Sequence, residues 1–326
     1  MILLTGGAGF IGSNLHAALS AGGQEVAVSD WLEREGKWRN LRQHPPSLLI
    51  APEKLDDFLA QAPEITAIVH LGAISDTTAC DGDLIWRHNV ALSQKLWSWC
   101  AAQGVRFIYA SSAATYGDGT AGFDDECSTQ ALRRLKPLNL YGWSKQAFDL
   151  WVARQVEALA PAPPAWAGVK FFNVYGPNEY HKGNMISVVK VKHDEILAGG
   201  PVRLFKSGQP GLADGAQQRD FIYIDDVVAA LRFLLTAPKI SGLFNLGTGQ
   251  ARSYAELARA VCAASGVAER ISYIEMPAAL QGQYQSFTQA SMARLRAAGF
   301  NHVFCTLEQG VTRYIQDYLT KADQYR

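Results

Sequence analysis

A tyrosine and a lysine four residues apart are the pair in this sequence best suited to moving a proton. In Tyr141-Gly-Trp-Ser-Lys145, both side chains would share one face of a helix, because positions i and i+4 are neighbours there. A phenol with a pKa near ~10 is a weak base at neutral pH. We expect the ammonium to favour the phenolate and so to make it useful for moving the proton of a substrate hydroxyl.

Two serines follow an apolar run that is typical of a buried strand. The run covers residues 106–109, and Ala110-Ser-Ser-Ala-Ala-Thr-Tyr-Gly117 follows it directly. Ligands of doubly wound folds bind beyond the carboxyl ends of the strands. We therefore expect Ser112 to hold the same substrate hydroxyl as Tyr141.

Three glycines near the N-terminus have the spacing of a dinucleotide-binding turn. Thr5-Gly-Gly-Ala-Gly-Phe-Ile-Gly12 lies between an apolar strand and a helix. Gly6, Gly9 and Gly12 would supply the tight turn, the close approach to a pyrophosphate and the close packing of helix on strand. An ordinary strand-to-helix turn is the alternative. Asp30 favours the dinucleotide, because it lies 18 residues past Gly12, where a carboxylate would bind the adenosine ribose.

The charges near Asp30 leave the choice of dinucleotide open. A carboxylate repels a 2′-phosphate and so favours NAD over NADP. Arg34, Lys37 and Lys54 follow and could neutralise that phosphate, although their spacing fits solvated surface charges equally well.

Alternating strand-like and helical runs must position these groups. The short apolar runs are residues 2–4, 25–29, 67–71, 106–110 and 169–172, and the longer amphipathic runs are 10–21, 84–102 and 141–159. This alternation predicts an α/β fold with a doubly wound, Rossmann-type parallel sheet. We expect a dinucleotide-binding domain that covers residues 1–172 plus about 220–249. A smaller, discontinuous substrate-binding domain is expected at 173–219 plus 250–326.

Composition narrows the class of protein. The 326 residues are 48% hydrophobic and 18% charged, with 30 basic and 30 acidic side chains. This balance gives no overall field that would attract nucleic acid or an anionic membrane. Five widely spaced cysteines indicate free thiols in a reducing compartment, and without a signal-like or membrane-spanning run we expect a cytoplasmic protein. No histidine pair has metal-ligand spacing, so no metal is expected.

The glycine turn, the strand-end serines and the tyrosine-lysine pair together resemble the extended short-chain dehydrogenase/reductase superfamily. The blocks at Asn89, 173–177, 219–221 and 244–249 extend the resemblance over essentially the whole chain. A second layer, Glu179-Tyr-His-Lys-Gly-Asn-Met185 and Gly282-Gln-Tyr-Gln-Ser-Phe-Thr-Gln-Ala290, resembles the ADP-glyceromanno-heptose 6-epimerase family.

The resemblance implies a nucleotide-sugar epimerase that inverts C6″ of an ADP-heptose by transient oxidation and re-reduction, supplying the inner-core heptose of lipopolysaccharide. It implies tightly bound NADP, with NAD the less favoured cofactor, and a homo-oligomer, in that family a homopentamer. Lys182 would be a second acid/base beside Tyr141, Ser112 and Lys145. The cofactor-binding residues it implies are Gly6, Gly9, Phe10, Ile11, Gly12, Asp30, Trp31, Lys37, Lys54, Leu71, Ser75, Asn89, Lys145 and Val174. The substrate-binding residues are Ser112, Asn173, Lys182, Asn184, Phe205, Arg219 and Tyr284.

Three features depart from that family's pattern. Trp31 stands where a small polar residue is common, Gln283 where an arginine is expected, and the stretch 208–215 is longer than usual. Trp31 would change the contacts with the ribose phosphate of the cofactor. The longer stretch 208–215 would change the loop over the nucleotide.

Two other functions remain open. Another epimerase of the superfamily, such as a UDP-sugar 4-epimerase, would use the same groups. A dehydratase is disfavoured, because Ala113 and Ala114 stand where elimination of water needs an acidic residue. A catalytically silent NADP-binding sensor is the alternative from a different class, and the intact Tyr141, Lys145 and Ser112 argue against it.

Overall fold

The computed structural model describes residues 1–33, 36–61, 64–237, 239–277 and 285–326. Within these residues the core is a seven-stranded sheet in the order β10-β6-β5-β4-β1-β2-β3, and each neighbouring pair is parallel. The strands are β1 (Ile2–Thr5), β2 (Val26–Ser29), β3 (Leu48–Ile50), β4 (Ala67–His70), β5 (Arg106–Ser112), β6 (Trp166–Phe171) and β10 (Ser241–Leu246). The predicted doubly wound parallel sheet is confirmed.

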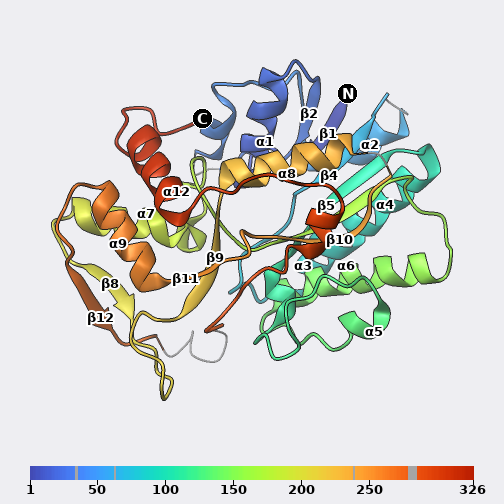
Figure 1. Cartoon of the computed structure of the whole chain (residues 1–326). Helices are drawn as coiled ribbons and strands as arrows, with labels where there is room; N and C mark the ends of the chain where they lie inside the picture. Colours follow the sequence, from blue (N-terminus) through green and yellow to red (C-terminus); the bar gives the residue numbers. More distant parts are fainter. Residues whose placement is uncertain (34–35, 62–63, 238, 278–284) are drawn as a thin grey trace.

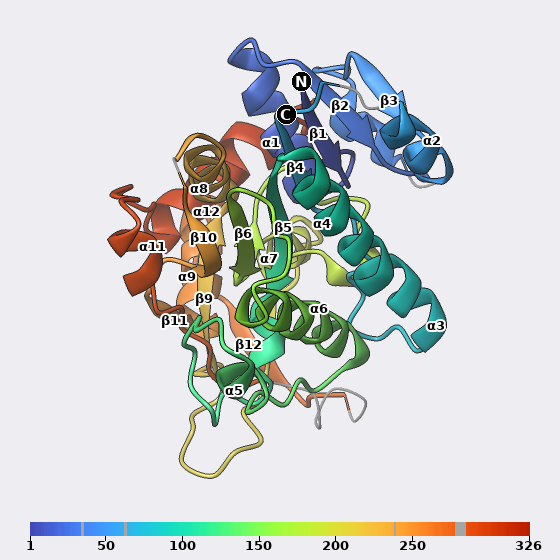
Figure 2. The same ribbon diagram turned by 90° about the vertical axis from the view of Figure 1, so that its right-hand side faces the viewer.

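Helices cover both faces of this sheet (Figures 1 and 2). Helices α1 (Phe10–Ala21) and α8 (Ile224–Thr236) pack on the face that carries Leu4 and Val28. The other face is covered by α2 (Leu55–Ala60), α4 (Leu92–Gln103) and α6 (Leu140–Glu157). Adjacent residues of one strand, such as Leu3 and Leu4, are therefore both buried, in two different cores. This explains the continuous apolar runs, since strands buried on both faces do not alternate.

The helical run predicted for residues 84–102 is broken into three parts. It consists of α3 (Gly82–Ile85), a π-helical turn η3 (Trp86–Ala91) and α4. The π turn lies beside α6 and lines part of the pocket described below through His88.

Helix α6 begins where its sequence provides a cap. The Asn139 side chain accepts a hydrogen bond from the Gly142 N–H at 2.8 Å, which satisfies one of the free donors of the first turn. Ser112, the last residue of β5, caps the short 3₁₀ helix η4 (Ala113–Tyr116) in the same way. These two caps fix the places from which Tyr141 and Ser112 project.

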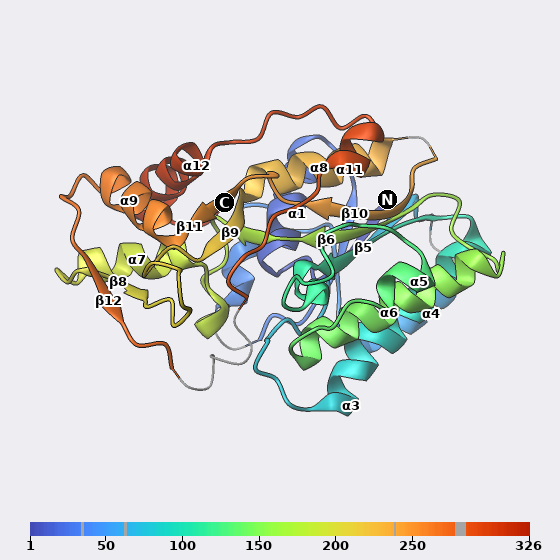
Figure 3. The ribbon, with the colours of Figure 1, turned by 60° about the horizontal axis from the view of Figure 1, so that its bottom comes forward.

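A smaller part of the chain lies beside the sheet (Figure 3). It contains a three-stranded sheet, β11-β9-β7, and a two-stranded one, β12-β8. Its strands are β7 (Asn173–Tyr175), β8 (Val202–Phe205), β9 (Gln218–Tyr223), β11 (Ala251–Ser253) and β12 (Ile271–Ile274). Its helices include α7 (Val188–Leu197), α9 (Tyr254–Ala264) and α12 (Leu307–Tyr314). The shorter elements of the chain are η1 (Lys37–Leu41), η2 (Pro52–Lys54), α5 (Thr129–Leu132), η5 (Gly183–Met185), α11 (Ala293–Ala297) and η6 (Ile315–Leu319).

Among the helices of the described residues, none combines the length and the apolar character needed to cross a membrane.

Candidate active site

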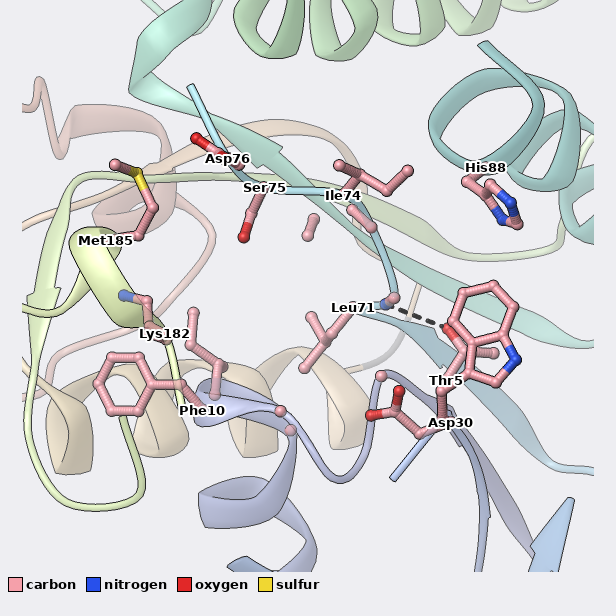
Figure 4. A pocket seen from close by; sticks show the side chains of 18 of the residues that line it. Thr5, Phe10, Asp30, Leu71, Ile74, Ser75, Asp76, His88, Lys182 and Met185 are labelled. Atoms are coloured by element: carbon pink, nitrogen blue, oxygen red, sulfur yellow. Dashed lines mark hydrogen bonds between the residues drawn. The ribbon is translucent and has the colours of Figure 1, made fainter. Parts of the chain in front are cut away.

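A cavity of about 780 Å³ lies at the carboxyl ends of β1, β2, β4 and β5, the edge at which doubly wound folds bind ligands. Figure 4 shows side chains from the first glycine turn, from the loop after β4 and from the turn before η5 around this space. The predicted site residues that line it are Gly6, Gly9, Phe10, Ile11, Gly12, Asp30, Trp31, Lys37, Leu71, Ser75, Ser112, Tyr141, Lys145, Val174, Lys182 and Asn184.

The glycine turn at the cavity floor requires glycine at two positions. Gly6 has a φ of +69°, in the left-handed region that residues with a side chain rarely adopt. A Cβ atom on Gly12 would overlap the carbonyl oxygen of Gly6. Gly9 caps α1 without a side-chain acceptor, so the first N–H groups of the helix are available to an anion. The turn therefore fits the pyrophosphate of a dinucleotide.

Asp30 lies at the edge of the cavity, directly after β2. Its Oδ2 accepts from the Ala8 N–H at 2.9 Å, and its Oδ1 accepts from Lys37 Nζ at 2.9 Å. Lys37 also donates to Glu33 at 3.1 Å. Lys54, by contrast, is not among the lining residues; its side chain is 73% exposed and pairs with Asp57.

Trp31 places an indole ring at this edge of the cavity. Its Nε1–H donates to Glu53 Oε1 at 2.6 Å, and its ring meets His88 edge-on with centroids 5.2 Å apart. The region that would receive the ribose of a dinucleotide is thus bordered by an aromatic wall and several carboxylates.

Tyr141 and Lys145 project into the cavity from the first turns of α6, as the i and i+4 spacing predicts. The Lys145 Nζ lies 5.9 Å from the centroid of the Tyr141 ring. Burial raises the pKa of the Tyr141 phenol, while a hydrogen bond with the Ser112 side chain acts in the opposite direction. The net direction is therefore opposite to the lowering that we expected from the ammonium, and burial is its largest cause.

Lys145 itself is strongly affected by its surroundings. Burial lowers the pKa of its ammonium to about 8, and the carboxylate of Asp149 opposes this change. An amine with a pKa near neutrality can hold or release a proton at little cost.

Lys182 reaches the same cavity from the turn that precedes η5, next to the Phe10 ring (Figure 4). Its Nζ lies 5.0 Å from the centroid of that ring and 4.0 Å from Oε2 of Glu179. Burial lowers the Lys182 pKa and Glu179 opposes that effect. The Glu179 side chain is fully buried, and the main-chain N–H and hydroxyl of Ser187 hold its carboxylate at 2.7 and 2.5 Å.

Asn89 is placed behind the cavity rather than in its lining. Its amide accepts from the Ile74 N–H and donates to the Ile74 carbonyl, both at 2.9 Å, and donates to Ser144 Oγ at 3.0 Å. It therefore shapes the loop after β4, which borders the cavity.

The remaining predicted substrate residues are spread over the smaller part of the chain. Asn173 lies at the start of β7, Phe205 at the end of β8 and Arg219 in β9, and these three are outside the lining of the cavity. Arg219 is buried and its guanidinium lies 5.8 Å from the Tyr254 ring centroid. Tyr284 and Gln283 lie outside the described residues.

Sequence reasoning missed several residues at this site. Thr5, Asp76, His88, His181 and Met185 line the cavity. His88 directly precedes Asn89, and this position is the signal that could have indicated it. Thr77 Oγ1 lies 3.6 Å from Met185 Sδ, so two loops that are far apart in the sequence meet at the cavity rim.

The parallel sheet, the glycine turn and the tyrosine-lysine pair at one cavity define a dinucleotide-dependent α/β enzyme. The chain belongs to the NAD dependent epimerase/dehydratase family, whose sequence pattern matches residues 2–247. It is similar to the ADP-L-glycero-D-manno-heptose-6-epimerase of Nitratidesulfovibrio vulgaris, at 45% identity over the whole of both chains.

Two solved structures show the same architecture. The Helicobacter pylori ADP-L-glycero-D-manno-heptose-6-epimerase is 28% identical, with a TM-score of 0.79 over 97% of this chain and 95% of that one. The Thermus thermophilus UDP-glucose 4-epimerase, solved in complex with NAD, is 27% identical, with a TM-score of 0.76 over 97% of each chain. This chain is an NAD(P)-dependent nucleotide-sugar epimerase.

Proposed function

We propose that this enzyme converts ADP-D-glycero-D-manno-heptose to ADP-L-glycero-D-manno-heptose by inverting C6″, a step that supplies the inner-core heptose of lipopolysaccharide. The names of its relatives state this activity for those proteins. One observation carries the proposal for this chain. A single cavity is lined by Tyr141 from α6, Ser112 from β5 and Lys182 from the turn before η5. It therefore presents two separate groups that can transfer a proton, the Tyr141 phenol and the Lys182 ammonium.

An epimerase that oxidises and re-reduces one carbon has a use for two proton-transfer groups. The carbonyl intermediate must turn over between the two steps, so its oxygen faces different side chains before and after. Tyr141 would exchange a proton with that oxygen in one orientation and Lys182 in the other. The use of two proton-transfer groups distinguishes an epimerase from an enzyme that presents only one face of its substrate.

The neighbouring side chains support these transfers. Ser112 would hold the C6″ hydroxyl by a hydrogen bond while Tyr141 takes its proton. Lys145, whose pKa is about 8, would favour the phenolate and bind the ribose hydroxyls of the cofactor. When bound, the nicotinamide dinucleotide supplies reversible hydride transfer, and no net oxidation results.

We propose NADP as the cofactor, because the family that the sequence resembles uses it and Lys37 lines the cavity. NAD is the alternative, favoured by the two carboxylates that already bind Lys37. Mass spectrometry of the cofactor released from the purified protein decides between them: a mass carrying the 2′-phosphate supports NADP, and its absence overturns that choice.

We propose that the chain has two functional domains. The dinucleotide would be bound by residues 1–172 with about 220–249. The pairing of β10 with β6 supports this assignment, because it joins the second of these segments to the main sheet. The ADP-sugar would be bound by residues 173–219 with 250–326. We also propose a cytoplasmic homo-oligomer, a homopentamer by the resemblance, which light scattering tests.

The proposed reaction is tested with purified, cofactor-loaded protein and ADP-D-glycero-D-manno-heptose. Proton NMR of the product should show the inverted C6″ configuration, and unchanged stereochemistry with folded, loaded protein overturns the proposal. UDP-glucose serves as the comparison substrate. Conversion of UDP-glucose at C4″ without conversion of the heptose would favour a 4-epimerase, and binding of cofactor without any turnover would favour the sensor.

A further inference from the structure

A buried ion pair lies directly behind the active site. Lys170 in β6 and Asp149 in α6 both have side chains that are 0% exposed, and Lys170 Nζ lies 2.6 Å from Asp149 Oδ2. Neither residue lines the cavity. Removing two charges from water is costly, and apolar side chains of similar volume are often as stabilising in such positions. The pair therefore calls for an explanation other than stability.

The Asp149 carboxylate joins α6 to the end of β5. Its Oδ2 also accepts from Ser111 Oγ at 2.7 Å, and its Oδ1 accepts from the Tyr109 hydroxyl at 3.1 Å. Ser111 directly precedes Ser112. Hydrogen bonds to an ionised group are short and strong, so this carboxylate fixes the catalytic helix against the strand that presents Ser112. Figure 2 shows α6 lying beside β5 and β6.

The Lys170 ammonium holds the turn on the other side of Ser112. It donates to Thr115 Oγ1 at 2.9 Å, and Thr115 Oγ1 in turn donates to the Ser112 carbonyl at 2.8 Å. Lys170 is also the register partner of Ser111 across the β5–β6 pair. Through both members of the pair, Ser112 is held relative to the helix that carries Tyr141 and Lys145.

The Asp149 carboxylate also affects the pKa values of the catalytic side chains. Asp149 lies one helical turn beyond Lys145 and two turns beyond Tyr141 on the same face of α6. Its carboxylate raises the pKa of both groups. Further titratable side chains line this cavity: Asp30, Glu33, Lys37, Asp76, His88, His181 and Lys182. His70 in β4 interacts electrostatically with Lys145, and Tyr109, Tyr116 and Cys127 interact in the same way with Asp149.

We propose that Asp149 and Lys170 are positioning residues for the reaction proposed above: together they hold Ser112, Tyr141 and Lys145 in one arrangement and set the electric field at these three side chains. The pair does not touch the substrate. Lys170 supplies the opposite charge next to the buried carboxylate.

The informative variant removes both charges at once. Asp149→Asn or Lys170→Met alone leaves one buried charge without its partner and is expected to fold poorly. The double variant Asp149→Asn/Lys170→Met has no such charge and keeps similar side-chain volumes. Lys170→Arg is the matched control, because it retains the counter-charge.

For the double variant we expect folded protein, a KM for the ADP-sugar within about twofold of wild type, and a kcat lower by roughly tenfold to a hundredfold. Because Asp149 raises the pKa of both Tyr141 and Lys145, both limbs of the kcat profile should move to lower pH. Lys170→Arg should leave both limbs at their wild-type positions. A structural defect alone would lower activity without moving the limbs.

A second measurement does not need turnover. The ultraviolet signal of tyrosinate, taken as the difference between each protein and its Tyr141→Phe counterpart, reports the titration of Tyr141 directly. It should also move to lower pH in the double variant. Unmoved titration in a folded double variant overturns the role of the pair. A wild-type enzyme inactive on ADP-heptose, with the titration shifting as expected, would overturn only the proposed reaction.

Discussion

Glu179 is the group that we expect to keep Lys182 protonated. Its carboxylate is fully buried and lies 4.0 Å from Lys182 Nζ, while Ser187 at the cap of α7 holds it in place. Two unit charges at that distance interact by about 4 kcal/mol at an effective dielectric constant of ~20, which equals about 3 pKa units. The Lys182 side chain is 24% exposed, so solvent screening reduces the expected shift to about 1 to 2 units.

The perturbation is Glu179→Gln, which removes the charge and keeps the shape. A nearby carboxylate raises the pKa of an ammonium, so its loss should lower the Lys182 pKa, on which burial already acts in that direction. If the proton donor of one half-reaction is Lys182, the alkaline limb of the kcat profile should move to lower pH by about 1 to 2 units. KM for the ADP-sugar should change little.

The assay is the initial rate of epimerisation between pH 6 and 10, followed by NMR of the heptose. Ser187→Ala is the matched control: it removes one hydrogen bond to the carboxylate but keeps the charge, so its alkaline limb should stay near that of the wild type. A folded Glu179→Gln enzyme with an unmoved alkaline limb would refute the reasoning, because Lys182 would then not titrate in the catalytic cycle.

Three further outcomes follow from the geometry of the site. Tyr141→Phe should lower kcat by roughly 10²- to 10⁴-fold while mass spectrometry still finds the cofactor bound; unchanged activity would favour the sensor. Gly12→Ala should destabilise the fold by about 1 to 3 kcal/mol and weaken cofactor retention, since its Cβ overlaps the Gly6 carbonyl oxygen; thermal unfolding and the released cofactor measure both effects. Burial lowers the His70 pKa from 6.5 to about 3, so this group's contribution to stability is complete above 6.5 and is lost as pH falls toward 3. Urea titrations should show wild type losing about 3 kcal/mol more than His70→Asn between pH 7 and pH 4.

The sheet and its helices could be predicted because their signals are local. Strands β1, β4 and β5 are mostly apolar because both of their faces are buried, and glycine turns or helical runs separate them. The cofactor-binding turn and the shared helix face of Tyr141 and Lys145 could be predicted in the same way, because each depends on residues that are close together in the sequence. The strands β3, β8 and β12 were missed. They are short or partly exposed, so their apolar pattern is weak.

The parts that could not be predicted depend on contacts between distant segments. Strand β9 contains the block 219–221 that carries part of the family resemblance, and its neighbours are β7 and β11 rather than strands of the main sheet. No pattern of nearby residues in the sequence specifies which strands β9 pairs with. The direction of the Tyr141 pKa depends on burial by the surrounding elements, and the partners of Asn89 lie 15 and 55 residues away.

One hydrogen-bonded path connects the cofactor turn to the catalytic helix. The path runs through Thr5, His70, Ser93, Asn89, Ser144 and the Tyr141 carbonyl, each link being between 2.6 and 3.0 Å. His70 is neutral at physiological pH because burial lowers its pKa to about 3, so its ring can donate to one neighbour and accept from the other. The backbone that cradles the dinucleotide and the backbone that presents the phenol are therefore parts of one buried framework. A bound nicotinamide would exchange hydride with the sugar carbon, and the phenol would exchange a proton with the oxygen on that carbon. Both transfers need a fixed separation between cofactor and phenol, which this framework provides before either ligand binds.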